Sequence, residues 1–225
     1  MKIVFKNYFR NKMVNLTKKS VKYFLPDSEF YAISLFKNDP SEYNDQELLD
    51  DDIKNFYFQT KYVNSNNSIT DHEDTTKTSG YANRDCIKYY SEGLNIIHSI
   101  FKDHDELIMV LAEDHYFTNG QTIKEIKENI TTNIYFSAPR WGYDNFNASL
   151  LCINFLQLSS LFPIVEHGDS GGVESHIVEN FTNKISPENI YIIKNRLAEN
   201  YMGDGRYTNS SKDIYADLKE AGILN

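Results

Sequence analysis

The stretch Leu107-Ile-Met-Val-Leu-Ala112, followed directly by Glu113-Asp114-His115, is the most informative part of this sequence. Six consecutive apolar residues are typical of a strand that is buried on both faces of a sheet. The strand then ends in two carboxylates and an imidazole. Because open α/β sheets bind their ligands beyond the carboxyl ends of the strands, this pattern predicts a central strand that leads into a functional site.

The flanking sequence alternates between β-prone runs and helical apolar spacing. Upstream we expect strands at Ile3–Phe5, Phe30–Phe36 and Phe56–Val63, and helices at Met13–Phe24 and Ile87–Phe101. Downstream we expect a short helix at Ile123–Ile130, a strand at Ile134–Phe136, a buried helix at Leu150–Phe162, and final helices at Pro187–Glu199 and Ser211–Leu224. The order predicts an α/β fold with a mainly parallel central sheet, flanking helices and a helix-rich C-terminus.

Composition narrows the class of protein. The 225 residues suit one α/β domain, and 23 Lys and Arg against 32 Asp and Glu give a net charge of −9, which disfavours a protein that wraps nucleic acid. No apolar run reaches the ~20 residues of a transmembrane segment. The N-terminal lysines are interrupted by polar residues, unlike a signal peptide, so we expect a cytoplasmic protein. Two cysteines, Cys86 and Cys152, exclude a disulfide scaffold and are expected in the core.

The residues after the central strand are suited to binding a cation. In an extended backbone Glu113 and His115 point the same way, and Asp114 points to the other face. A carboxylate with an imidazole suits Mn²⁺, whereas carboxylates alone suit Mg²⁺. The alternative is a polar strand end with an ordinary salt bridge.

The element order and the Glu113-Asp114-His115 motif together resemble the nucleotide-binding half of glycosyltransferases with the GT-A fold, which is related to the Rossmann fold. In that superfamily an Asp-any-Asp motif, or a variant that ends in His, holds Mn²⁺ against the diphosphate of a nucleoside-diphosphate sugar. Here Glu113 stands where the family has Asp, so either Glu113 or Asp114 is the carboxylate that reaches the metal. The resemblance covers roughly residues 1–180 in element order, an order that doubly wound folds share in general.

The resemblance implies one GT-A-like domain over residues 1–225. Residues 1–116 would form the nucleotide-binding half and residues 117–183 the acceptor half. Residues 184–225 would form C-terminal helices and a lid.

The nucleotide is expected in a cleft between the end of the first strand, Phe5–Tyr8, and the helix start at Asn83–Asp85. Arg84 near a helix N-terminus suits a phosphate, although a surface salt bridge is the alternative. Trp141 offers a ring for stacking on a sugar, and a core position is the alternative. With what the resemblance adds, the residues expected to bind the nucleotide sugar are Tyr8, Asn83, Arg84, Asp114 and Trp141.

A second polar segment, Glu166–His176, is rich in glycine, which lets a loop approach a ligand closely. The family often places an acidic residue after a glycine-rich turn, where it acts as the base in inverting members. Gly171-Gly-Val-Glu174 resembles that arrangement, Asp169 competes for the role, and His176 is a candidate metal ligand. The alternative is a flexible loop with a helix cap at Asp169 or Ser170.

The sequence thus predicts a metal-dependent glycosyltransferase that uses a nucleoside-diphosphate sugar. The acceptor, whether a glycan, lipid, protein or nucleic acid, stays open, as do the donor sugar and the choice between inversion and retention. One alternative is a nucleotidyltransferase that acts on a sugar phosphate, for which a glycine-rich loop is expected after the first strand; Asn7–Asn11 contains no glycine. Another is a non-catalytic α/β binding module.

Overall fold

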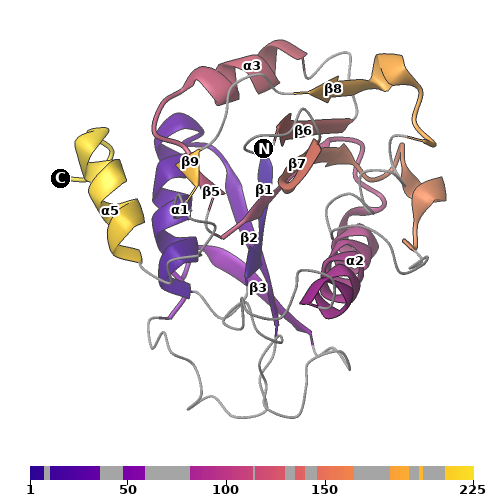
Figure 1. Cartoon of the computed structure of the whole chain (residues 1–225), viewed down its shortest axis with the longest axis horizontal. Coiled ribbons are helices and arrows are strands. Elements are labelled where there is room, and N and C mark those ends of the chain that lie inside the picture. The colour runs from indigo at the N-terminus through magenta and orange to yellow at the C-terminus, as the bar shows by residue number, and fades with distance from the viewer. Residues whose placement is uncertain are drawn as a thin grey trace.

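The computed structural model shows one central sheet with helices packed on both of its faces (Figure 1). It describes residues 1–7, 11–35, 48–58, 82–113, 115–129, 135–139, 146–164, 183–192, 198–199 and 211–225. For residues 35, 58, 82–91, 135–139, 146–149, 192, 198–199 and 211–213 it describes the backbone alone.

Strands and helices alternate through the first half of the chain. Their bounds are β1 (Lys2–Asn7), α1 (Asn11–Phe24), β2 (Glu29–Leu35), β3 (Ile53–Phe58), α2 (Ala82–Phe101), β4 (Leu107–Ala112), β5 (His115–Tyr116) and α3 (Gln121–Asn129). The second half contains β6 (Tyr135–Pro139), β7 (Phe146–Asn154), the short 3₁₀ helices η2 (Ser159–Leu161) and η3 (Pro187–Asn189), β8 (Ile190–Ile192), β9 (Ala198–Glu199) and α5 (Ser211–Glu220).

Seven strands form the main sheet in the order β3-β2-β1-β4-β7-β6-β8, and β5 pairs with β9 in a separate two-stranded sheet. The first four strands are mutually parallel, with Val4 aligned with both Tyr31 of β2 and Val110 of β4. Beyond β4 the pairing with β7 is antiparallel, β7 pairs antiparallel with β6, and β6 pairs parallel with β8. The predicted α/β class with a mainly parallel sheet is confirmed.

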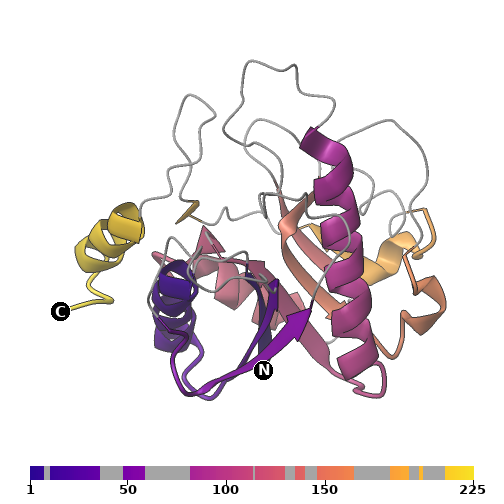
Figure 2. The same ribbon diagram turned by 90° about the horizontal axis from the view of Figure 1, so that it is seen from below.

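The core lies on both faces of β4 because its side chains alternate between them. Leu107, Met109 and Leu111 join a cluster that includes Val14 and Val21 of α1 and Ile123 and Ile126 of α3. On the opposite face, Ile108 and Val110 pack in a cluster with Leu94, Ile97 and Phe101 of α2. Figures 1 and 2 show α1 and α2 on opposite sides of the sheet.

Two predicted helices are strands in the structure. The apolar run at Leu150–Phe162 was predicted as a helix, but its first half belongs to β7, which lies between β4 and β6. Leu150, Leu151, Cys152 and Ile153 are fully buried, because both faces of β7 are covered. A strand buried on both faces has a continuous apolar sequence, which periodicity cannot separate from a buried helix.

The predicted helix at Pro187–Glu199 is also wrong. Pro187 opens a single 3₁₀ turn, and the next residues, Ile190–Ile192, form β8 against β6. Ala198–Glu199 then form β9. β-branched and aromatic side chains favour a strand where a sheet edge is open to them. The final helix, predicted from Ser211, is confirmed as α5.

The third strand begins earlier than predicted. It starts at Ile53, which aligns with Phe30 of β2, and not at Phe56. The acidic residues just before it are held by α1, since Lys18 forms ion pairs with Asp50 and Asp52. None of the described helices is long and apolar enough to cross a membrane.

Candidate active site

The carboxyl ends of β1 and β2 carry a network of buried and partly buried polar side chains. The Asn7 amide donates hydrogen bonds to Ser34 Oγ at 2.8 Å and to Asn11 Oδ1 at 2.7 Å. Ser34 Oγ in turn donates to Asn55 Oδ1 at 2.6 Å. The network joins β1, β2, β3 and the first turn of α1. The edge of the sheet at which the nucleotide was predicted is therefore polar, and these side chains hold one another in place.

The predicted metal motif begins where β4 ends. Lys6 of β1 aligns with Ala112 of β4, so the residues that follow them, Asn7 and Glu113, come next at this edge. Glu113 lies in a turn, and His115 opens β5. We had expected an extended backbone here, in which Glu113 and His115 point the same way. Because the chain turns at Glu113, the alternation of side chains along a strand does not apply to this pair.

The first and last residues of the motif are both buried. The residues Glu113 and His115 are each 6 % exposed. A buried carboxylate requires cations or hydrogen-bond donors around it, and a carboxylate beside an imidazole is a donor set that Mn²⁺ accepts. Among the residues that the structure describes, which leave out Asp114, no three acidic, histidine or cysteine side chains gather to hold a cation.

Helix α1 holds both ends of the motif turn. Thr17 Oγ1 donates a hydrogen bond to the carbonyl oxygen of Glu113 at 2.7 Å. At the other end, the Phe117 amide donates to Ser20 Oγ at 3.2 Å. Thr17 and Ser20 are fully buried, and the sequence analysis had not assigned them to the site. The sequence pattern that could have identified them is a pair of hydroxyl residues, three positions apart, on the otherwise apolar face of a predicted helix.

The C-terminal part of the chain returns to this turn. In the β5–β9 sheet, His115 aligns with Glu199 and Tyr116 aligns with Ala198, in antiparallel pairing. The backbone of the motif is thus paired with a segment that lies more than eighty positions further along the chain. Backbone pairing of this kind fixes where His115 sits.

Most of the other predicted site residues lie outside the described part of the chain. Asn83 and Arg84 are in the first turn of α2, and the structure describes their backbone only. Because α2 connects the parallel strands β3 and β4, its first turn belongs to the carboxyl edge of the sheet. The residues outside the described part are Tyr8, Asp114, Trp141, Asp169, Glu174 and His176.

The segment that leads towards the second predicted motif is anchored by α2. The Asn95 side chain donates to the Ile164 carbonyl oxygen at 3.1 Å and accepts from the Ile164 amide at 2.7 Å. One turn further along, the His98 ring stacks on Phe162 with centroids 4.3 Å apart and an interplanar angle of 3°. Burial of His98 holds its pKa below the usual 6.5, so the ring favours the neutral form. The glycine-rich segment that begins at Glu166 therefore starts two residues after Ile164, whose backbone is anchored to α2.

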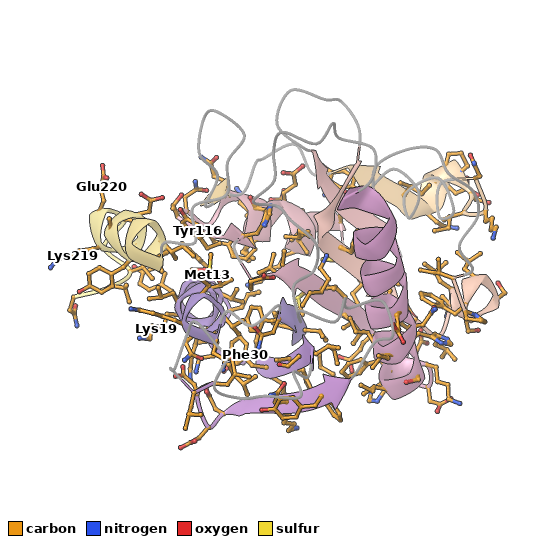
Figure 3. The ribbon with its side chains drawn as sticks, turned by 60° about the horizontal axis from the view of Figure 1, so that its bottom comes forward. Met13, Lys19, Phe30, Tyr116, Lys219 and Glu220 are labelled. Atoms are coloured by element: carbon orange, nitrogen blue, oxygen red, sulfur yellow. The ribbon has the colours of Figure 1, made fainter. Side chains whose placement is uncertain are left out.

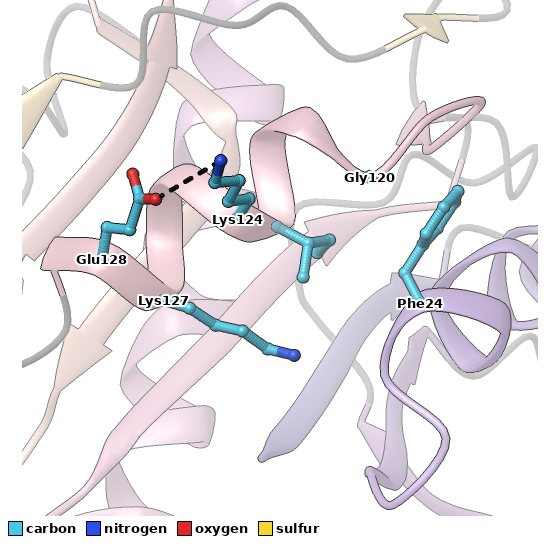
Figure 4. A pocket seen from close by; sticks show the side chains of 6 residues that line it. Phe24, Gly120, Lys124, Lys127 and Glu128 are labelled. Atoms are coloured by element: carbon cyan, nitrogen blue, oxygen red, sulfur yellow. Dashed lines mark ion pairs between the residues drawn. The ribbon is translucent and has the colours of Figure 1, made fainter.

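Two further features are not part of this site. Burial raises the pKa of the Cys152 thiol to about 12, so it stays protonated and is a core residue, as predicted. A cavity of about 410 Å³ lies between the end of α1 and the start of α3 (Figure 4). Its described lining includes the Lys124–Glu128 ion pair and the Phe24 ring, and neither Glu113 nor His115, the two predicted site residues whose side chains the structure describes.

No protein-family model matches the sequence, and no curated protein matches it either. Solved structures do match the fold. A protein of Desulfovibrio desulfuricans described as a nucleotide-diphospho-sugar transferase superposes with a TM-score of 0.53 at 9% identity, covering 98% of this chain and 94% of that one. The 4-diphosphocytidyl-2C-methyl-D-erythritol synthase of Anaerococcus prevotii gives a TM-score of 0.52 at 8% identity, covering 98% and 95%.

The glycosyltransferase GlyE of Streptococcus pneumoniae is a more distant match, with a TM-score of 0.45 at 14% identity. The match covers 86% of this chain and 45% of GlyE, so the chain spans less than half the length of that protein. At these identities the comparisons establish the fold, and the GT-A-like α/β architecture implied by the resemblance is confirmed.

Proposed function

We propose that this protein is a glycosyltransferase that moves a sugar from a nucleoside-diphosphate sugar to an acceptor hydroxyl. The observation that carries the proposal is the burial of Glu113 and His115 at the carboxyl end of the central parallel strand, beside the polar ends of β1 and β2. Sheets of this topology bind ligands at that edge. The matched protein of D. desulfuricans, described as a nucleotide-diphospho-sugar transferase, has the same fold.

In this proposal Glu113 or Asp114, together with His115, holds Mn²⁺ or Mg²⁺, and His176 is a further candidate ligand. A divalent cation bound there supplies a Lewis acid that neutralises the charge of the diphosphate leaving group. The hydrogen bonds from Thr17 and Ser20 of α1 keep the Glu113 turn in one position before the cation and the sugar nucleotide bind, which lowers the free-energy cost of assembling the site.

The remaining residues act on the sugar nucleotide and the acceptor. Arg84 at the start of α2 binds a phosphate oxygen, Tyr8 and Asn83 contact the nucleotide, and Trp141 stacks on a sugar face. The acceptor oxygen forms a bond to the anomeric carbon as the bond from that carbon to the diphosphate oxygen breaks. Glu174 or Asp169 accepts the proton of the acceptor hydroxyl if the reaction inverts the anomeric configuration.

The proposal is tested by a thermal-denaturation screen of UDP-, GDP- and CDP-linked sugars, each with Mn²⁺. A ligand at one hundred times its Kd raises the free energy of unfolding by roughly 2.7 kcal/mol, which is a resolvable shift. We expect at least one sugar nucleotide to give such a shift and to release its nucleoside diphosphate during prolonged incubation. A binding module would give the shift without the release.

A nucleotidyltransferase is the second candidate, because the A. prevotii synthase superposes with a TM-score of 0.52, close to the 0.53 of the D. desulfuricans protein. Against it stands the segment between β1 and α1, which lacks a glycine-rich phosphate loop in its sequence. Incubation with nucleoside triphosphates and sugar phosphates separates the two. Release of pyrophosphate would favour this second function, and release of a nucleoside diphosphate from a sugar nucleotide would favour the first.

A further inference from the structure

The residue that follows His115 is tied to the C-terminal helix. Tyr116 is almost completely buried, and its hydroxyl donates a hydrogen bond to Oδ2 of Asp217 in α5. The two residues are 101 positions apart in the sequence. A bond between a phenol and a carboxylate is charge-assisted, so it is stronger and more directional than a bond between neutral groups.

An apolar cluster surrounds this hydrogen bond. Helix α5 packs on α1 in a cluster of Met13, Leu16, Tyr116, Ile214 and Leu218, with Ile223 and Leu224 partly buried against it. Figure 3 shows Tyr116 and Met13 on the side of α5 that faces the rest of the protein, and Lys219 and Glu220 on its outer side. The apolar contacts hold α5 against α1, and the hydrogen bond of Asp217 fixes the helix relative to Tyr116.

Tyr116 moves with the motif because it shares a peptide bond with His115. The turn from Glu113 to Phe117 is thus held by Thr17 and Ser20 of α1, by backbone pairing with β9, and by Asp217 of α5. The first two contacts fix the ends of the turn. The contact with Asp217 is the one that acts through the side chain next to His115.

We propose that α5 is a positioning element for the cation site, and that the Tyr116–Asp217 hydrogen bond is the contact through which it acts. This inference rests on the proposed function of Glu113, Asp114 and His115. Neither Tyr116 nor Asp217 is a ligand in this proposal; together they hold His115 in the position from which it binds. Partners that orient metal ligands from outside the coordination sphere typically change metal affinity by about 10–100-fold when they are removed.

The test measures Mn²⁺ affinity by calorimetry, with and without a nucleoside diphosphate, in Tyr116→Phe, Asp217→Ala and the double variant. We expect each single variant to weaken Mn²⁺ binding by roughly 10–100-fold and the double variant to be no weaker than either one. Asp217→Asn keeps an oxygen acceptor for the phenol, so it should retain most of the affinity. Matched controls are Tyr215→Phe and Glu220→Ala, exposed residues of the same helix whose replacement should leave the affinity unchanged.

Wild-type affinity in Tyr116→Phe, or additive losses in the double variant, would overturn the inference. Hydrogen exchange separates its failure from a failure of the proposed function. We expect amides of residues 113–117 to exchange about tenfold faster in Tyr116→Phe than in Tyr215→Phe. Faster exchange in a protein whose wild type binds no Mn²⁺ would show that α5 orders the turn, and would reject both the proposed function and a role of α5 in cation binding. Unchanged exchange would reject the positioning role.

Discussion

The hydroxyl of Thr17 lies 2.7 Å from the carbonyl oxygen of Glu113 and donates a hydrogen bond to it. This contact joins the middle of α1 to the first residue of the motif, 96 positions further along the chain. It also explains why a polar residue occupies a fully buried position of an amphipathic helix, since a hydroxyl can be buried there at low cost only with a partner. The position of the Glu113 turn is therefore decided by α1 as well as by the sheet.

Replacing Thr17 with Val keeps the shape of the side chain and removes this hydrogen bond. We expect a loss of about 0.5–1.5 kcal/mol in the free energy of unfolding, the usual net value of such a bond. Chemical denaturation measures it. Lys19→Ala, at an exposed position of the same helix, is the control and should stay within about 0.5 kcal/mol of the wild type. A Thr17→Val protein as stable as this control would show that the contact contributes nothing.

Asn95 anchors the backbone of Ile164 through two hydrogen bonds. Asn95→Ala removes both, and we expect the free energy of unfolding to fall by about 1–3 kcal/mol because two backbone groups lose their partner. The Ile164 amide should exchange with solvent faster. Ser99→Ala is the control, since the exposed Ser99 hydroxyl donates to the Ile96 carbonyl oxygen within its own helix. Equal exchange at Ile164 in both variants would contradict the anchoring role.

His98 should make stability depend on pH. Burial, followed by the charge of Lys102, lowers its pKa in the folded protein below the usual 6.5. The unfolded chain therefore binds a proton more readily, and stability should fall as pH drops below 6.5 towards the folded pKa. His98→Phe keeps a ring against Phe162 and has no proton to bind. Denaturation between pH 7.5 and 5 should show a smaller pH-dependent loss in this variant; identical pH profiles would contradict the prediction.

The base is predicted in the glycine-rich segment. Replacing the true base by its amide, Glu174→Gln or Asp169→Asn, should lower turnover by about 10²–10⁴-fold because proton transfer is lost. Nucleotide binding should change little, so the effect appears in kcat and not in the affinity of the donor. Steady-state kinetics of the two variants measures it. Near-normal transfer by both would place the base elsewhere or indicate a retaining reaction.

Local sequence patterns were sufficient for the elements that place the site. Leu107–Ala112 was predicted with its observed bounds, because a run of six apolar residues ended by acidic ones has few other interpretations. The spacing of Leu94, Ile97 and Phe101 correctly placed α2, and these three side chains are buried. The helix predicted at Met13–Phe24 ends at Phe24 as expected, two residues before Pro26, which cannot continue a helix.

The remaining elements depend on contacts that sequence patterns do not contain. Leu150–Ile153 forms a strand because β4 and β6 flank it, and Ile190–Ile192 forms one because the edge of β6 is beside it. The same holds for the site. Thr17 contacts Glu113, and Asp217 contacts Tyr116, from segments far apart in sequence. A buried hydroxyl on the apolar face of a helix indicates that Thr17 has a partner, but the local sequence does not identify that partner as Glu113.

The burial of the motif changes how it must be tested. Glu113 and His115 are both buried, although they follow the end of the strand. A truncation such as His115→Ala therefore removes packing as well as a ligand. Loss of activity alone would not separate the two effects, so a binding measurement on protein shown to be folded is needed.

The most direct measurement is the affinity of the wild-type protein for UDP, GDP and CDP, by calorimetry, in EDTA and then with Mn²⁺. A diphosphate beside two carboxylates is repelled without a cation and attracted with one. We predict that at least one nucleotide binds at least about tenfold more tightly with Mn²⁺, a difference of about 1.4 kcal/mol, and that Asp114→Asn and His115→Asn lose this gain while remaining folded. Equal affinity in EDTA and in Mn²⁺, or no binding of any of the three, would contradict a cation-dependent nucleotide-sugar site at Glu113–His115.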